Sequence, residues 1–229
     1  RISFKGFSPH KRTISIIYQV GVPSIIMQSI SSVMTFGLNK ILISFSETAV
    51  AVFGVYFKLQ SFIFMPIFGL NNGMIPIVAY NYGARSKKRI METVWLSIGI
   101  AVGIMLIGLM VFHLMTPQLL MLFQADEEML AIGVPALRII SLSFLFAGYC
   151  IIVGSVFQAL GNGVYSLIIS AARQLVCILP LAWFFARTFG LHAVWLSLPL
   201  AEITSVVLSS VLFRKIYLDK IKPLGQAAA

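Results

Sequence analysis

The sequence predicts an all-α membrane protein with six transmembrane helices, and three observations support this fold class. Hydrophobic residues make up 59% of the 229-residue chain and charged residues only 10%, whereas a soluble domain is about one-quarter charged. The apolar residues form long runs, and a spanning helix needs about 20 of them. The basic residues gather between these runs. Together these features argue against a disordered chain, a disulfide scaffold and a soluble enzyme.

Six apolar runs are expected to cross the membrane. The first extends from residue 14 to about 45 and is long enough to be tilted. The second, at about 48–80, is expected to be interrupted because it contains Pro66, Pro76 and several Gly and Asn residues. The others are expected at 93–114, about 130–160, 165–185 and 193–213, with kinks in spans one, five and six at Pro23, Pro180 and Pro199.

The basic clusters predict the orientation of these spans. An even number of spans separates each cluster from the next, so all three lie on one side, and the positive-inside rule makes that side cytoplasmic. The clusters are Arg1, Lys5, Lys11 and Arg12; Arg85, Lys87, Lys88 and Arg89; and Arg214, Lys215, Lys220 and Lys222.

This orientation divides the chain into three parts and explains its net charge of +10. Residues 1–13 form a cytoplasmic basic segment, 14–214 the transmembrane lobe, and 215–229 a cytoplasmic tail whose end resembles a cloning remnant. The expected location is the plasma (inner) membrane, with both termini cytoplasmic and the lipid bilayer as partner. Because the charge has this explanation, no nucleic-acid partner is expected.

Four ionisable residues fall inside the predicted spans: Lys58, Arg138, Arg173 and Glu202. Such residues are costly in lipid and usually face a cavity or a partner. Helix rise places the first two and Glu202 at similar depth, so Glu202 is expected to pair with Lys58 or Arg138. It then acts either as a proton-exchanging group or as a permanent bridge between helices. For Arg173 we expect a structural role, with bonds to Gln174 or to helix-end carbonyls.

The balance of these charges and the nearby amides predict a polar cavity. Three cations against one anion leave the cavity positive, so it favours anionic or zwitterionic groups unless another part of the protein supplies carboxylates. Four amides are expected to contribute to the same pathway, although each also suits simple bonding between helices. These are Gln28, Asn71, Asn72 and Gln174.

Signatures of enzymes and metal sites are missing from the sequence. It contains no P-loop, G-x-S-x-G or H-E-x-x-H motif, and His10, His113 and His192 lie far apart. We therefore expect no catalytic residue, no cofactor and no metal. Cys150 and Cys177 lie in apolar runs and are expected to be buried free thiols.

The order of several motifs resembles one half of a MATE (multidrug and toxic compound extrusion) transporter. The stretch GLNNGMIPIVAYNYGARSKKRI at 69–90 is similar to the end of the second helix in each half, and Asn81, Gly83 and Ala84 match its end. The stretch at 135–162 resembles the fourth helix, and 173–183 and 190–202 resemble the fifth and sixth. The similarity covers nearly the whole chain.

This resemblance implies the C-terminal six-helix lobe of a twelve-helix transporter, with the N-terminal lobe as its partner. It also implies efflux of small amphipathic, mostly cationic compounds in exchange for H⁺ or Na⁺. The chain departs from sodium-coupled relatives because its first helix offers Gln28 but no carboxylate, and its fourth carries Arg138 and no acid. Glu202 is therefore the local candidate for coupling. The alternatives are a flippase for lipid-linked glycans and a non-transporting lobe or membrane scaffold.

Overall fold

The computed structural model describes residues 10–225, and these residues are almost entirely helical. Residues 1–9 and 226–229, which include Arg1, Lys5 and the end of the predicted tail, lie outside the described part. The elements, in order, are α1 (Lys11–Leu42), α2 (Glu47–Gly83), α3 (Lys87–Leu114), α4 (Thr116–Met121), α5 (Glu127–Ser141), α6 (Phe144–Ala159), α7 (Gly163–Ala171), the π-helix η1 (Ala172–Ile178), α8 (Leu179–Thr188), α9 (Leu191–Val194), α10 (Ser197–Ile216), the π-turn η2 (Tyr217–Ile221) and the 3₁₀ turn η3 (Lys222–Gly225).

Length and composition confirm the predicted all-α membrane fold. Within residues 10–225, five helical stretches are long and apolar enough to cross a membrane. The pair α5 and α6 passes the same test together, with a bend of 48° between the two helices, and makes six spans when the pair is counted as one. Large hydrophobic side chains cover much of the outer surface, as expected for helices that face lipid.

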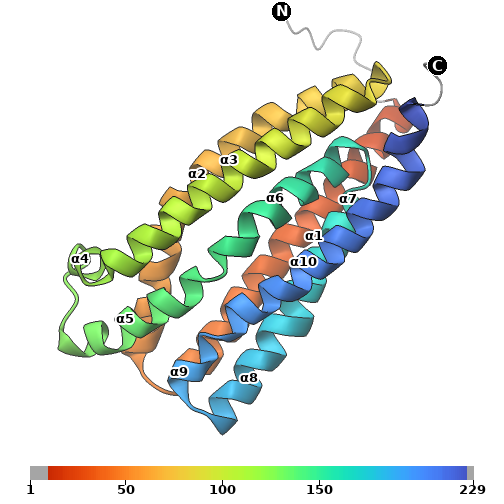
Figure 1. The fold of residues 1–229 in the computed structure, drawn as a ribbon. Helices are drawn as coiled ribbons and strands as arrows, with labels where there is room; N and C mark the ends of the chain where they lie inside the picture. Colours follow the sequence, from red (N-terminus) through yellow and green to blue (C-terminus); the bar gives the residue numbers. More distant parts are fainter. Residues whose placement is uncertain (1–9, 226–229) are drawn as a thin grey trace, which may run out of the picture.

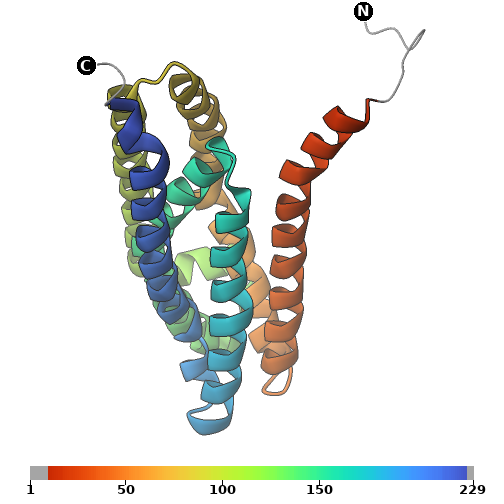
Figure 2. The ribbon, with the colours of Figure 1, turned by 90° about the vertical axis from the view of Figure 1, so that its right-hand side faces the viewer.

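The helices run side by side with their connections at two opposite ends (Figure 1). The start of α1, the α2–α3 connection, the α6–α7 connection and the end of the described chain share one end. This grouping agrees with the predicted topology, which places the three basic clusters on one side of the membrane. Helix α1 stands on the opposite side of the bundle from α3 and α10 (Figure 2).

The core depends on close approach of α3 to α6 and of α2 to α3. A Cβ atom added at Gly148 in α6 would lie 3.1 Å from the backbone C and O atoms of Ala101 in α3. A Cβ atom at Gly108 in α3 would lie 2.6 Å from Ile63 Cγ2 in α2. Small residues at such crossings let backbones pack tightly in membranes, where the hydrophobic effect does not drive helices together.

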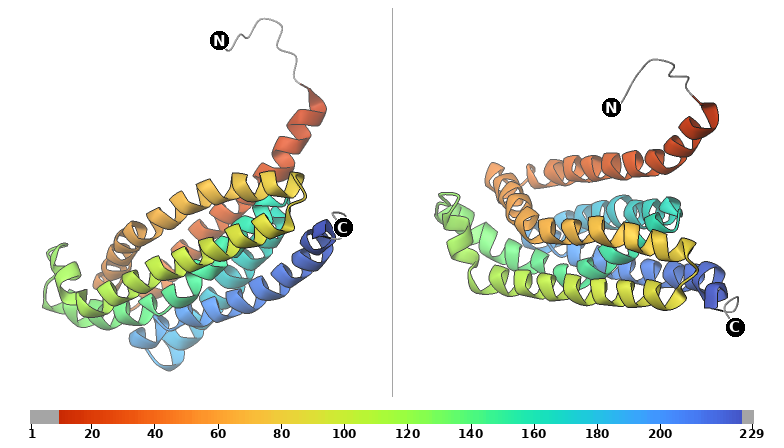
Figure 3. Two further views of the ribbon diagram at one scale, coloured as in Figure 1. Left: turned by 45° about the horizontal axis from the view of Figure 1, so that its top comes forward. Right: turned by 90° about the horizontal axis from the view of Figure 1, so that it is seen from above.

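The backbone irregularities differ from the predicted ones. Helix α2 stays continuous through Pro66 and Pro76, so the predicted interruption of the second span is wrong. Proline removes one hydrogen bond and bends a helix without necessarily ending it, and α2 curves along its length (Figure 3). The sharp bend lies instead between α5 and α6, where the N–H groups of Leu142 and Ser143 bond the carbonyls three residues earlier.

The C-terminal turns pack onto the end of the bundle that holds the basic clusters. Lys220 Nζ donates to the carbonyl oxygen of Leu160 at the end of α6, at 2.9 Å. Asn162 Nδ2 donates to the same oxygen at 3.2 Å. The Lys87 ammonium lies 5.4 Å from the ring centroid of Tyr217. The Lys220 hydrogen bond therefore joins η2 to the end of α6, and the cation–π contact joins η2 to α3.

We predict that Gly148→Ala lowers the thermal unfolding midpoint of the purified protein in detergent. The new methyl group meets backbone atoms that cannot rotate away, and overpacking costs about 1–3 kcal/mol. Gly103→Ala, also within a membrane-spanning helix, is the matched control because its added Cβ meets no heavy atom within 4 Å. Equal unfolding midpoints for the two variants would contradict the close α3–α6 crossing.

Candidate functional site

A cavity of about 770 Å³ lies inside the helix bundle, and we call it the lobe cavity. Its walls come from α1, α2, α6, α7, η1 and α10, with hydroxyl, amide, thioether and aromatic side chains. On α10 the lining residues are Leu198, Glu202 and Ser205, which a helical period places on one face. The lobe cavity therefore brings together segments that are far apart in the sequence.

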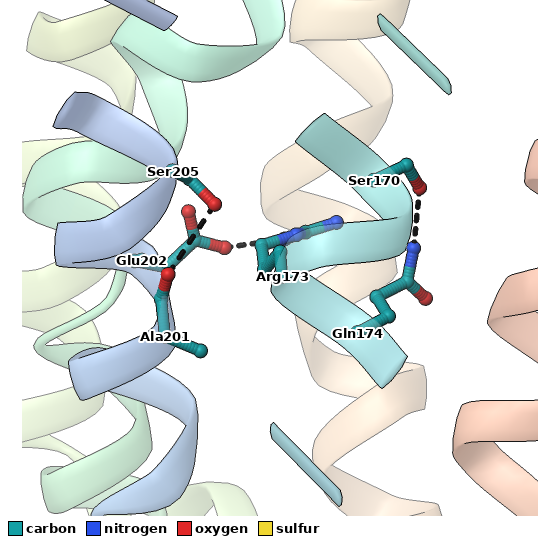
Figure 4. A network of polar contacts seen from close by, with 6 residues as sticks. All are labelled: Ser170, Arg173, Gln174, Ala201, Glu202 and Ser205. Atoms are coloured by element: carbon teal, nitrogen blue, oxygen red, sulfur yellow. Dashed lines mark hydrogen bonds and ion pairs between the residues drawn. The ribbon is translucent and has the colours of Figure 1, made fainter. Parts of the chain in front are cut away.

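The Arg173–Glu202 ion pair crosses the lobe cavity from η1 to α10 (Figure 4). Arg173 Nη1 donates to Glu202 Oε1. The Glu202 side chain is only 6% exposed, whereas that of Arg173 is 34% exposed. The expectation that Glu202 pairs with Lys58 or Arg138 is wrong, and Arg173 is the partner. Among the described residues the other ion pair, Lys88–Glu92 at 3.9 Å, lies on the surface.

Lys58 and Arg138 lie outside the lobe cavity. Lys58 is exposed, and its Nζ atom lies 5.7 Å from the ring centroid of Phe123. Arg138 is also exposed, and its Nε donates to Thr116 Oγ1 at 3.4 Å. Viewed down the axis of α2, the cavity-lining residues cluster around the direction in which Phe57 points. Each residue of an α-helix is rotated by about 100° from the one before it, so Lys58 points about 100° away from the middle of this cluster. Similar depth did not imply contact, because depth does not fix which side of a helix a residue occupies.

A π-helix places Arg173 at the lobe cavity. Residues 172–178 form η1, and Pro180 follows at the start of α8. Proline has no N–H to bond the preceding turn, and π-helical turns often occur at functional sites. Gln174 Nε2 donates to Ser170 Oγ at 2.6 Å (Figure 4). The expected bond between Arg173 and Gln174 is therefore absent from the described part, and each side chain has its own partner.

All four predicted amides line the lobe cavity. Asn71 and Gln174 are buried, whereas Gln28 and Asn72 are exposed within the described chain. Asn71 Oδ1 and Glu202 Oε2 are buried oxygen atoms without a hydrogen-bond partner. Such atoms are costly unless water or a ligand reaches them. Whether these amides take part in transport stays a prediction.

Sequence reasoning missed a set of hydroxyls in the lobe cavity. Each donates to the carbonyl oxygen four residues earlier in its own helix, so its lone pairs remain free to accept. The set consists of Ser31, Thr35, Ser61, Ser155 and Ser205. In α1 the spacing of Gln28, Ser31 and Thr35 by three and four residues places them on one helix face, and this pattern could have predicted a polar face. The residues singled out from the sequence were instead the ionisable and amide ones.

The site offers no cluster of metal ligands within residues 10–225. Groups of three or more His, Cys, Asp or Glu side chains that could hold a metal ion are not found there. Cys150 lines the lobe cavity, and both cysteines are free and half-buried. The described lining of the cavity offers groups for ion pairing, hydrogen bonding and apolar contact.

The fold is that of a helical membrane protein whose bundle holds a polar cavity. The MatE family model matches residues 23–184, which is most of the chain. The chain therefore belongs to the MATE family, and the predicted lobe architecture is confirmed.

Known relatives and solved structures agree with this assignment. The multidrug export protein MepA of Staphylococcus aureus is 28% identical over 204 residues, which cover 88% of this chain and 44% of MepA. An outward-facing multidrug resistance MATE family transporter of the MOP superfamily superposes with a TM-score of 0.86 at 26% identity, over 98% of this chain and 50% of the other. The same values apply to a MOP superfamily transporter from Pyrococcus furiosus, described as having a binding pocket of reversed polarity. The chain thus spans about half the length of the curated relatives it matches.

We predict that Arg173→Gln destabilises the protein more than the double change Arg173→Gln/Glu202→Gln does. The single change leaves a buried carboxylate without its counter-charge, whereas the double change removes both charges. Because Arg173 is one-third exposed, we expect a loss of about 1–3 kcal/mol for the single variant. Thermal unfolding in detergent measures it, and Arg138→Gln, at an exposed arginine outside the cavity, serves as control.

Proposed function

We propose that the chain forms the C-terminal half of a secondary active multidrug efflux antiporter rather than an enzyme. It exports small amphipathic, mostly cationic compounds in exchange for H⁺ or Na⁺. The observation that carries this proposal is the lobe cavity, in which a buried ion pair lies among hydroxyls, amides and aromatic rings. Membrane proteins retain ionisable residues inside spans mainly along substrate and ion pathways. Membership of the MATE family and the similarity to multidrug transporters support the same activity.

The partner of this half is the N-terminal lobe of the same transporter, in the same lipid bilayer. Helix α1 carries a second hollow lined by Gln28, Ser31, Ser32, Thr35, Phe36 and Asn39. Gln28 and Ser32 are exposed there, although exposed polar groups are unfavourable against lipid. We expect this face of α1 to border a water-filled path or the other lobe. The proposed location is the cell membrane, with both termini cytoplasmic, because the basic clusters share one end.

Glu202 is the proposed coupling residue. It is the one carboxylate among the residues that line the lobe cavity, and the other ionisable groups there are Arg173, Tyr56 and Cys150. A carboxylate that is buried inside a membrane span and paired with an arginine in a polar cavity is typical of ion and proton pathways.

A flippase for lipid-linked glycans is the less favoured function. The sequence favours this function only if Lys58, Arg138 and Arg173 all share the cavity with Glu202 and make it positive. Because Lys58 and Arg138 lie outside the lobe cavity, the described lining holds one cation and one anion. A cavity with balanced charge gives no particular attraction to an anionic lipid-linked substrate. A non-transporting scaffold would need neither the cavity nor the buried pair.

We predict that Glu202→Gln in the full-length protein uncouples dye efflux from an imposed proton gradient in proteoliposomes. The amide keeps the shape of the side chain but cannot bind and release a proton. Glu92→Gln is the matched control, since it removes a carboxylate from an exposed ion pair. If Glu202→Gln keeps wild-type efflux driven by the proton gradient, Glu202 has no coupling role.

The coupling ion follows from the same assay. Efflux is measured under a proton gradient and then under a sodium gradient, and the gradient that drives the wild-type protein identifies the ion. Because the residues of the lobe cavity include only one carboxylate and Arg173 already pairs with it, we expect the proton gradient to be the effective one. Efflux driven by sodium alone would contradict this expectation.

A further inference from the structure

We infer that Arg173 is a tethered cation that competes with a cationic ligand for Glu202. A ligand amine binds the carboxylate by displacing the guanidinium, and the returning guanidinium releases the ligand. This inference rests on the proposed transport function and extends it, because it assigns the lobe cavity a binding partner of defined chemistry and assigns Arg173 a positioning role.

Glu202 has one cationic partner, Arg173, in the described part of the chain. Its Oε1 accepts from Arg173, and its Oε2 is buried with no hydrogen-bond partner. The side chain is 6% exposed, so bulk water does not solvate the carboxylate. A buried carboxylate is costly unless it is paired with a positive charge or takes up a proton. Glu202 must therefore hold Arg173, a proton or another cation.

The described cavity offers Glu202 no second protein cation. Arg173 is the one Lys or Arg among the lining residues. Lys58 contacts Phe123, and Arg138 contacts Thr116, both away from the cavity. If Arg173 leaves, the replacement must therefore come from solution. That replacement is either a proton or a ligand that brings its own positive charge into the cavity.

Arg173 is placed to leave and return. One-third of its side chain is exposed, far more than that of Glu202. Within residues 10–225 its side chain makes a hydrogen bond with Glu202 and with no other residue. It also belongs to the π-helix η1 (Figure 4), and π-turns are local departures from the regular α-helix. By contrast, the neighbouring Gln174 is buried and bonded to Ser170, so it does not share this freedom.

The ligand class follows from what the guanidinium gives to Glu202. Arg173 supplies a positive charge and an N–H donor, so an equal replacement supplies both. A protonated amine or an amidinium does so, and apolar groups attached to it can contact Tyr56, Phe57 and Phe64 of the cavity wall. A quaternary ammonium of similar size brings charge without a donor and leaves the carboxylate without a hydrogen bond.

The test measures binding of 4-phenylbutylammonium to the purified full-length protein by calorimetry. Arg173→Gln removes the competitor, so we expect it to bind this probe about ten-fold more tightly than the wild type. Glu202→Gln is expected to bind it about ten-fold more weakly, and the double variant to match Glu202→Gln. Arg138→Gln is the control and should leave affinity unchanged. Uncharged 4-phenylbutanol should bind wild type and Arg173→Gln equally, since no displacement is required.

Each outcome separates this inference from the function on which it rests. Unchanged or weaker binding of the ammonium probe to Arg173→Gln, together with weaker binding to Glu202→Gln, overturns the competition and leaves the proposed function standing. Full binding and pH-driven transport by Glu202→Gln overturn the coupling role of Glu202. If Arg173→Gln does not fold, Arg173→Lys replaces it. The shorter ammonium competes less well, so affinity should rise above wild type, and unchanged affinity overturns the inference.

The kinetics of efflux give a second test, because loss of a purely structural arginine would not change the maximal rate and the half-saturating concentration in the same way. Tighter binding without the returning guanidinium slows release, so Arg173→Gln should lower both the maximal efflux rate and the substrate concentration needed for half of it. A structural loss would lower the rate without improving binding.

Discussion

The pairing of Glu202 with Arg173 constrains the rest of the cavity. A carboxylate inside the membrane needs a counter-charge, and the one available to it comes from a helix 29 positions away in sequence. The contact requires η1 and α10 to lie side by side and requires the ring of helices around the lobe cavity to keep its shape. The tight crossings at Gly148 and Gly108 on the far side of α6 and α3 supply that rigidity.

Two of the irregular backbone segments border the lobe cavity. Ser143, at the bend between α5 and α6, lines the cavity, and so do Arg173 and Gln174 of the π-helix. Backbone departures inside a membrane are tolerated where protein or a water-filled space satisfies the freed polar groups. The long helix α3 faces lipid and protein without lining the cavity, and it remains regular from Lys87 to Leu114. The bend between α5 and α6 and the π-helix η1 therefore both lie on the cavity side of the bundle.

Much of the fold could be predicted from the sequence, because apolar runs and basic clusters are one-dimensional signals. The six spans and the grouping of their ends on two sides follow from them. The partner of Glu202 could not be predicted, since it depends on the rotation of each helix about its own axis. A π-turn changes that rotation for Arg173, and it leaves no clear pattern beyond the nearby Pro180. For Pro66 and Pro76 the sequence predicted an interruption that does not occur, because α2 bends and stays continuous through both prolines.

The same rotation changes what the cavity selects. With Lys58 and Arg138 counted as lining residues, the cavity would attract anions. With both on other faces, its described lining carries one positive and one negative group that neutralise each other. Long-range attraction then contributes little, and selection depends on whether a ligand can take over one member of the pair. Arg173 is the more exposed member, so we propose that the cation is the member that yields and that the ligand which replaces it is itself cationic. A cavity whose ion pair has no net charge is therefore compatible with the proposed export of cations. The Glu202 carboxylate that a cation needs is present, and Arg173 pairs with it until a cation replaces the guanidinium.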